Sequence, residues 1–351
     1  MNKNIKILVT TGVFILVVSI MNSCMEKDPS LGALPVPSFK SVPITPANGS
    51  PFNVMLINTT PTPGIAFWTT SIGARLRGDT VRAMFTYAGD YSVQLKIAGQ
   101  GGIDSLTQVI NVPENNPYAV DANSILALLS GAGLGLDQRT WMPERAVNTV
   151  VRWTGNENIL NWINGNEVIG VPAVAFGTDD IADGSAWNGY FDDQYTFTFD
   201  LAQRFIYDDN KTVSLDGGDP LFVSAWIQAL PTPWNTYKGT TSSTDLYNLV
   251  PDLKPWGSGI FTYSIEVAPA GDRGLGTITV NGIGAHIGFQ DKTDKNSGAA
   301  NQVIPTVESI TYDILQISRN LTDEGGIYDR IIVGVTPRVG QAWSFMLKSY
   351  Q

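Results

Sequence analysis

The sequence predicts a mainly β protein in which a small β domain is followed by a larger one. Three observations lead to this prediction. The 351 residues include 35 glycines and 20 prolines, a composition typical of many short strands joined by turns. Apolar and polar residues alternate with a period of two in several segments. A turn-rich linker, residues 113–117, separates the two parts of the chain.

The N-terminal segment has the features of a secretory signal. Lys3 and Lys6 precede an apolar stretch from Ile7 to Ile20, and the only cysteine of the chain, Cys24, follows closely. An uncleaved membrane anchor is the alternative, but spanning a bilayer takes about 20 apolar residues. A cysteine at this point resembles a bacterial lipoprotein signal, which implies a signal peptide over residues 1–24 and a lipid on Cys24. Residues 25–37 lack periodicity, so we expect them to form a flexible tether.

Composition excludes several kinds of chemistry. The net charge is −10 and no basic tract follows the signal, which argues against nucleic-acid binding. With Cys24 lipidated, neither a thiolate nucleophile nor a cysteine zinc cluster remains. His286 is the only histidine, so the chain has no multi-histidine metal site.

Residues 38–113 form the first predicted domain. In its longest alternating segment, Tyr91, Val93, Leu95 and Ile97 are expected to share one buried face of a strand. The stretch from Phe85 to Leu95 places an aromatic residue, a glycine and a second aromatic before this strand. It resembles the signature of PKD domains, which are small immunoglobulin-like sandwiches. The resemblance implies a spacer domain with Trp68 in its core.

Residues 118–351 form the second predicted domain. It opens with a short predicted helix over residues 124–131, capped by Asn123 or Asp121 and ended by Gly131. Strand patterns follow, in which alternate residues are aromatic or aliphatic, at residues 195–199, 261–267 and 343–347.

One segment of this domain predicts a β-hairpin. Asn281 and Gly282 separate two alternating runs, and Asn-Gly is the strongest short-range signal for a two-residue hairpin loop. In that register Val280 faces Ile283. Thr277 then faces His286 on a shallow surface, which a ligand or a covering loop would occupy.

The second domain also resembles a known group. The segment from Trp187 to Phe197 is similar to one found in Bacteroidetes surface glycan-binding lipoproteins of the SusE type, and segments around Trp141, 312–317 and 342–345 fit the same pattern. These proteins pair a PKD-type domain with a jelly-roll β-sandwich that resembles carbohydrate-binding domains. The resemblance implies an outer-membrane, lipid-anchored protein on the cell surface that binds polysaccharide or oligosaccharide and assists a SusC/SusD-type importer complex.

Aromatic residues in polar surroundings are the candidate sugar contacts, because sugar C–H faces stack on aromatic rings while sugar hydroxyls need amide or carboxylate partners. Large aromatic residues are also commonly buried, and we expect Trp226 and Trp343 to lie in the core. The candidate ligand-binding residues are Trp187, Tyr190, Trp234, Trp256, Trp153, Trp162, Asn188 and His286.

Carboxylates supply two further hypotheses. Asp192 and Asp193 are candidate ligands of a structural calcium ion, although a carboxylate that caps a turn is the commoner outcome. A glycoside hydrolase or lyase would need two carboxylates across a cleft, here Asp192 or Asp193 with Glu157 or Glu167. No paired-glutamate motif supports an enzyme. A non-enzymatic adhesin or structural lipoprotein, with buried tryptophans, is the other alternative.

Overall fold

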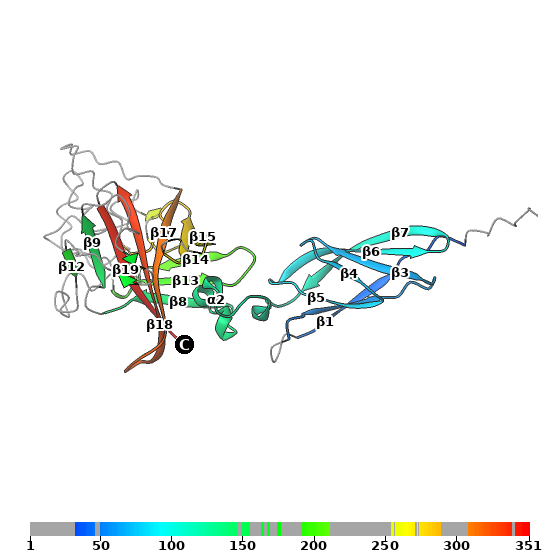
Figure 1. Ribbon diagram of the computed structural model, residues 1–351, viewed down its shortest axis with the longest axis horizontal. Coiled ribbons are helices and arrows are strands. Elements are labelled where there is room, and N and C mark those ends of the chain that lie inside the picture. Colours follow the sequence, from blue (N-terminus) through cyan, green and yellow to red (C-terminus); the bar gives the residue numbers. More distant parts are fainter. Residues whose placement is uncertain are drawn as a thin grey trace, which may run out of the picture. The chain divides into compact units, whose positions relative to one another are not determined.

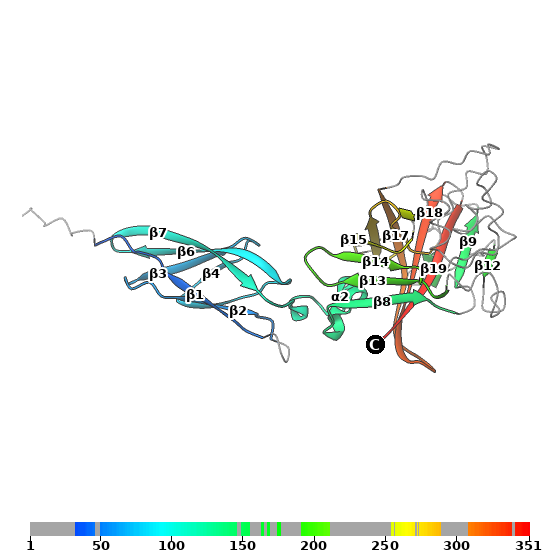
Figure 2. The same ribbon diagram turned by 180° about the vertical axis from the view of Figure 1, so that it is seen from behind.

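The protein is described from a computed structural model. The structure describes residues 32–45, 50–145, 149–154, 163–164, 167–168, 174–176, 191–210, 254–255, 257–270, 272, 274–288, 308–338 and 341–351. The chain is mainly β and divides into two compact units (Figures 1 and 2). The first unit comprises Met1–Ile44, Phe52–Ala83 and Asp90–Val112, and the second comprises Thr45–Pro51, Met84–Gly89 and Pro113–Gln351.

The first unit contains two antiparallel sheets, one with the order β1-β2-β5 and one with the order β4-β3-β6-β7. The strands are β1 (Phe39–Pro43), β2 (Val54–Asn58), β3 (Gly64–Thr70), β4 (Arg75–Arg77), β5 (Thr80–Ala83), β6 (Gly89–Gly99) and β7 (Gly102–Val112).

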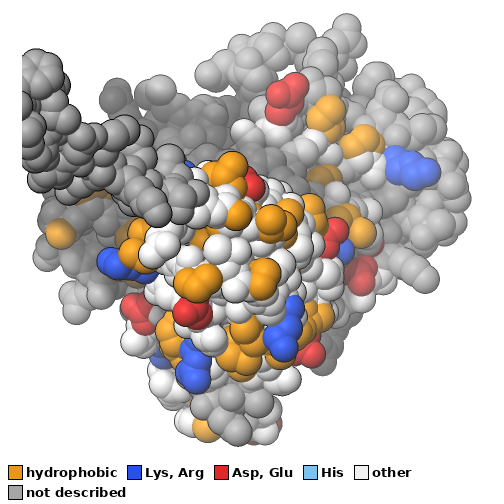
Figure 3. Space-filling model, turned by 90° about the vertical axis from the view of Figure 1, so that its right-hand side faces the viewer, with side chains coloured by type: hydrophobic (Ala, Val, Ile, Leu, Met, Phe, Trp, Pro, Cys, Tyr) orange, Lys and Arg blue, Asp and Glu red, His pale blue; other side chains and the backbone are white. Residues whose placement is uncertain are grey.

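Side chains from both of these sheets form the core of the first unit. Tyr91, Val93, Leu95 and Ile97 are buried, as their alternation predicts. Trp68 is 1% exposed, and its ring lies 5.1 Å from that of Phe39 on the other sheet. The expectation that Trp68 is a core residue is therefore confirmed. Figure 3 shows the surface of the molecule in space-filling form. On the face in view, apolar side chains (orange) lie next to Lys and Arg side chains (blue).

The second unit opens with short helices. They are η2 (Pro117–Ala119), α2 (Ile125–Ser130) and η3 (Ala132–Leu134). The predicted helix is thus confirmed in α2, and Gly131 ends it with a φ of 81°. The predicted cap is wrong, because Ser124 caps the helix through its side-chain oxygen, which accepts a hydrogen bond from the backbone N–H of Ala127.

Twelve strands follow in the second unit. They are β8 (Gln138–Pro143), β9 (Val150–Thr154), β10 (Ile163–Asn164), β11 (Glu167–Val168), β12 (Val174–Phe176), β13 (Gln194–Thr198), β14 (Arg204–Asp208), β15 (Gly259–Val267), β16 (Gly276–Asn281), β17 (Ser309–Asp323), β18 (Gly326–Arg338) and β19 (Gln341–Tyr350).

Eight of these strands form one antiparallel sheet that closes on itself. β8 pairs with β13, each strand from β13 to β19 pairs with the next, and β19 returns to pair with β8. We call these eight strands the closed sheet. The first half of β19, residues 341–345, pairs with β9. β12 pairs with the other edge of β9. The strands therefore follow their order in the sequence, whereas a jelly roll has Greek-key crossings between two sheets. The strand pairings of the described residues therefore do not support the predicted jelly-roll sandwich.

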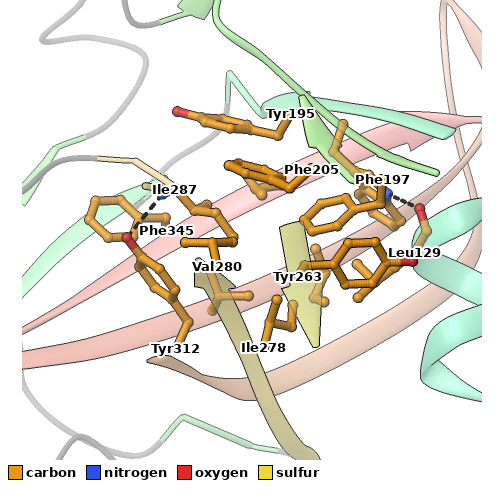
Figure 4. Packing of buried hydrophobic residues seen from close by; sticks show 14 of the residues in the cluster. Leu129, Tyr195, Phe197, Phe205, Tyr263, Ile278, Val280, Ile287, Tyr312 and Phe345 are labelled. Atoms are coloured by element: carbon orange, nitrogen blue, oxygen red, sulfur yellow. Dashed lines mark hydrogen bonds between the residues drawn. The ribbon is translucent and has the colours of Figure 1, made fainter. Parts of the chain in front are cut away.

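The core of the second unit lies inside the closed sheet and is rich in aromatic residues (Figure 4). Tyr195 stacks on Tyr207, and Phe197 meets Tyr263 edge-on. Residues on alternate strand positions fill the interior because successive side chains of a strand point to opposite faces. Trp343 is 1% exposed, which confirms its predicted core position. Within the described residues, no helix is both long and apolar enough to cross a membrane.

Candidate functional site

Four aspartates gather where the β13–β14 hairpin is open. Asp192 and Asp193 precede β13, and Asp208 and Asp209 lie at the end of β14. Antiparallel pairing of Gln194 with Asp208 places the two pairs at the same edge of the sheet. Asp193 and Asp209 are buried, whereas the side chain of Asp208 is exposed. We call these four residues the acidic end of the closed sheet.

Two polar residues connect the acidic end. The side-chain amide of Asn210 donates to the backbone carbonyl of Asp192, and its backbone N–H donates to the carboxylate of Asp208 at 2.9 Å. The hydroxyl of Ser258 donates to the Asp209 carboxylate at 2.7 Å and accepts from the Asp209 backbone N–H at 3.0 Å. The start of β13, the end of β14 and the residue before β15 are thereby held together.

Asp193 is held in an environment that favours its neutral form. Burial is the largest cause of a pKa well above the usual aspartate range, and the negative charges of Asp192 and Asp209 add to it. Hydrogen bonds from the hydroxyls of Tyr207 and Tyr195 act in the opposite direction. The Tyr195 hydroxyl lies 3.4 Å from the Asp193 carboxylate. Asp193 is thus a buried structural carboxyl, because other protein groups surround it.

His286 lies beside Tyr207, whose hydroxyl bonds to Asp193, and not on a strand face. Its ring is 4.6 Å from the ring of Tyr207, and the residue is 1% exposed. The predicted hairpin is wrong, because β16 pairs with β15 on one edge and with β17 on the other, so that Thr277 faces Asp313. The shallow face on which His286 was expected to meet a ligand therefore does not form.

The residues after β16 turn into the core instead. Ala285 and Ile287 join the buried cluster inside the closed sheet. The backbone N–H of Ile287 donates to the hydroxyl of Tyr312 at 2.9 Å (Figure 4). The backbone N–H of Gly288 donates to the hydroxyl of Tyr195 at 3.0 Å. We call residues 282–288 the inserted segment. Its contacts with Tyr195 and Tyr207 place it next to the end of the closed sheet that carries the four aspartates.

The described residues of the acidic end provide few ligands for a metal ion. No group of three or more His, Cys, Asp or Glu residues in the described part of the chain is placed to hold one. Calcium prefers six or more oxygen ligands. Asp193 is buried, and its carboxylate already accepts hydrogen bonds from the hydroxyls of Tyr207 and Tyr195. The exposed carboxylate of Asp208 remains able to accept hydrogen bonds from hydroxyl groups of a ligand.

Most predicted sugar contacts lie outside the described residues. These are Trp162, Trp187, Asn188, Tyr190, Trp234 and Trp256, together with the proposed lipid site Cys24 and the alternative carboxylate Glu157. For Trp153 and Glu167 the structure describes the backbone alone, in β9 and β11. The three tryptophans whose side chains are described, Trp68, Trp141 and Trp343, are each at most 1% exposed.

Sequence reasoning missed four members of the site: Asp208, Asp209, Asn210 and Ser258. The run Asp208-Asp209-Asn210 at the end of an alternating segment was a visible signal of a polar strand end. Ser258 carried no such signal, because its role comes from hydrogen bonds to residues about 50 positions away.

The likeness of this chain to known proteins is limited to part of its length. No family model matches the chain, and no curated protein matches it. Two solved structures show a likeness that covers 23% of this chain. One is the PKD1 domain of the Vibrio cholerae metalloprotease PrtV, at 24% identity over 99% of that domain, with a TM-score of 0.20. The other is the PKD1 domain of Vibrio anguillarum Epp, at 20% identity over 96% of that domain, also with a TM-score of 0.20.

Proposed function

We propose that this protein is a lipid-anchored protein of the outer membrane that binds polysaccharide at the cell surface for a SusC/SusD-type importer. In this proposal Cys24 carries the lipid, the first unit is a PKD-type spacer, and the second unit is the carbohydrate-binding domain. The sugar site lies at the acidic end of the closed sheet. Glycan binding does not depend on a jelly-roll topology, because function resides in a site and many folds carry such sites.

The proposal rests on one observation: at the acidic end, hydrogen bonds bring together three segments that lie apart in the sequence. Asp192, Asn210 and Ser258 are linked through direct hydrogen bonds and through Asp208 and Asp209. Candidate sugar contacts flank these positions in the sequence. Tyr190 lies two residues before Asp192, and Trp256 lies two residues before Ser258.

The chemistry of a sugar site suits this arrangement. Carboxylate oxygens accept hydrogen bonds from sugar hydroxyls, and aromatic rings stack on the apolar faces of the sugar. Asp208 offers an exposed carboxylate, and Asn210 offers an exposed amide that also holds the strand ends in place. Single sites of this kind gain from many copies on one membrane, since a polymer then binds several at once.

Affinity electrophoresis tests the proposal. The protein from Met25 to Gln351 is run through gels that contain single polysaccharides, with and without a chelator. We expect one polymer to retard it, and we expect Trp256→Ala, Trp187→Ala or Trp234→Ala to remove the retardation. Tyr118→Ala is the control, since Tyr118 is an exposed aromatic residue in the same unit, 46% accessible, outside the acidic end.

Each other result has a defined meaning. Absence of retardation by any polymer contradicts glycan binding and favours an adhesin or structural role. Release of free sugar favours a glycoside hydrolase or lyase. If the polymer retards the protein without chelator but not with it, a calcium ion is assigned to the site. For the anchor, Cys24→Ala is expected to abolish incorporation of a labelled fatty acid in cells.

A further inference from the structure

One sheet face of the first unit combines cations with exposed apolar side chains. On the outer side of the β4-β3-β6 strands, Phe67 lies in register between Arg77 on one neighbouring strand and Lys96 on the other. The guanidinium carbon of Arg77 is 5.6 Å from the centre of the Phe67 ring. Arg75 lies on the same face, opposite Thr69 and two residue pairs from Phe67, and Ile65 lies on it two residues before Phe67. We call Ile65, Phe67, Arg75, Arg77 and Lys96 the basic-aromatic face.

The side chains of this face point to solvent. Phe67 is 39% exposed and Ile65 is 46% exposed. Their chain neighbours Ala66 and Trp68 are buried, because successive residues of a strand alternate between the two faces of a sheet. In the part of the chain that the structure describes, no carboxylate forms an ion pair with Arg75, Arg77 or Lys96.

The charge of this region differs from that of the whole chain. Residues 32–112 contain five Lys or Arg and three Asp, a net charge of +2, whereas the complete chain carries −10. Three of the five cations belong to the basic-aromatic face. The face is therefore complementary to an anionic surface, although the protein as a whole is acidic.

The path of the chain brings this face close to the proposed lipid. A Cβ added at Gly101 would lie 2.1 Å from the carbonyl oxygen of Gly32, so the incoming chain runs beside the turn between β6 and β7. Gly99, next to that turn, pairs with Gly64, and Phe67 is three residues further along β3. That separation is about 10 Å along a strand.

The chain between the lipid and this point is short. Residues 25–31 separate Cys24 from Gly32. Fully extended, such a segment spans at most about 28 Å. A lipid on Cys24 would therefore keep the basic-aromatic face near the headgroups of the same membrane.

We propose that the basic-aromatic face binds the surface of an anionic lipid bilayer and so orients the first unit on the membrane that holds its anchor. Cations near an anionic bilayer are attracted to it, and an exposed aromatic ring enters the interface between headgroups and acyl chains. The closeness of the face to the membrane rests on the proposed lipid on Cys24. The affinity of the face for lipid depends neither on the anchor nor on glycan binding.

Vesicle co-sedimentation tests the proposal with the unlipidated chain, Met25 to Gln351. Vesicles of phosphatidylcholine with about 30% phosphatidylglycerol are compared with phosphatidylcholine alone, at about 0.05 M and about 0.3 M salt. We expect binding to the anionic vesicles only, and weaker binding at the higher salt. Arg75→Glu with Arg77→Glu is expected to lower the partition coefficient about 10-fold or more. Phe67→Ser is expected to lower it several-fold.

A matched control lies on the other sheet of the same unit. Lys40 and Arg82 are exposed cations on β1 and β5, and reversing both changes the net charge by the same amount as the double substitution at Arg75 and Arg77. We expect Lys40→Glu with Arg82→Glu to keep the partition coefficient within about two-fold, because those side chains lie outside the basic-aromatic face. Thermal melting of each variant verifies folding.

Three results would overturn the proposal. The first is failure of the unsubstituted protein to bind anionic vesicles. The second is an equal loss in the Lys40 and Arg82 control, which would indicate a response to net charge alone. The third is gel retardation by an acidic polymer such as polygalacturonate, dependent on Arg75 and Arg77, in a protein that does not bind vesicles. That result would make the face a glycan site. If gel retardation by a neutral polysaccharide persists in the Arg75 and Arg77 variant, glycan binding stands whatever the vesicles show.

Discussion

The guanidinium of Arg139 and the carboxylate of Asp329 form an ion pair of 2.8 Å inside the closed sheet, although 190 residues separate them in the sequence. Both side chains are 3% exposed. Arg139 also donates to the hydroxyl and the backbone carbonyl of Ser349 and to the carbonyl of Leu128. One guanidinium thus connects β8, β18, β19 and α2.

Removing one member of this pair is expected to destabilise the second unit strongly. A buried charge that loses its partner typically costs about 3–5 kcal/mol. Asp329→Leu or Arg139→Met alone is therefore expected to lower the free energy of unfolding by about that amount, measured by urea unfolding. The double substitution Arg139→Met with Asp329→Leu is expected to recover a large part of the loss, because no unpaired charge remains. A double variant as unstable as the two losses added together would contradict this account.

The same pair predicts loss of stability in acid. Burial raises the pKa of Asp329, but the backbone N–H of Asn320 and the guanidinium of Arg139 lower it by more, so its pKa lies below the usual aspartate value. Its contribution to stability is therefore full above the unfolded pKa of about 3.9 and is lost as the pH falls through the folded pKa. Urea midpoints measured between neutral and acidic pH should fall less in Asp329→Leu than in the unsubstituted protein.

Asp193 predicts the opposite dependence on pH. Its pKa is raised in the folded protein, mainly by burial, so the folded state holds a proton that the unfolded state has released. Stability should therefore decrease as the pH rises above about 3.9, until the folded pKa is passed. Asp193→Asn is expected to remove this decrease and to stabilise the protein at neutral pH. An unchanged slope of urea midpoint against pH in Asp193→Asn would contradict the assignment.

The inserted segment depends on two tyrosine hydroxyls. Tyr312→Phe and Tyr195→Phe each leave one buried backbone N–H, that of Ile287 or Gly288, without its acceptor. Such a loss costs about 1–3 kcal/mol. We expect both variants to accelerate amide hydrogen exchange at residues 285–288 and to leave exchange in β6 unchanged. Tyr118→Phe serves as the control, since Tyr118 is 46% exposed. Equal acceleration in the control would show that the hydroxyls do not hold the segment.

Gly288 offers a steric test of the same segment. A Cβ at Gly288 would lie 2.4 Å from the ring of Phe345, whereas a Cβ at Gly135 would meet nothing within 4 Å. The two glycines have similar positive φ angles, 68° and 76°, so alanine meets similar backbone strain at both. Gly288→Ala is expected to cost about 1–3 kcal/mol more than Gly135→Ala, because it overfills a packed core. Equal unfolding free energies for the two variants would argue against the insertion.

The burial pattern of single strands was predictable from the sequence. Tyr91, Val93, Leu95 and Ile97 are buried on β6, and Trp343, Phe345 and Leu347 are buried on β19. This follows because the pleat of a strand is a local property, and alternation therefore indicates which side chains face a core. The helix at residues 125–130 was predictable for a similar reason, since caps and glycine stops act within one turn.

The partners of each strand were not predictable in the same way. Asn281-Gly282 is a strong local turn signal, yet Gly282 donates its backbone N–H to the carbonyl of Glu308 and β16 pairs with β17. A central strand needs partners on both edges, and burial of Ala285 and Ile287 inside the closed sheet outweighs a local hairpin.

By itself, the sequence determined the β class, the alternating core residues, the position of α2 and the places where charged and aromatic residues are concentrated. The tertiary structure decided the closure of the eight-stranded sheet, the burial of His286, the pairing of Arg139 with Asp329 and the meeting of Asp208, Asp209 and Ser258. The physical reason is the range of the interactions. Pleat and cap geometry act between near neighbours in the chain, whereas sheet closure and buried polar contacts join residues tens to hundreds of positions apart, and only the folded chain selects among the possible partners.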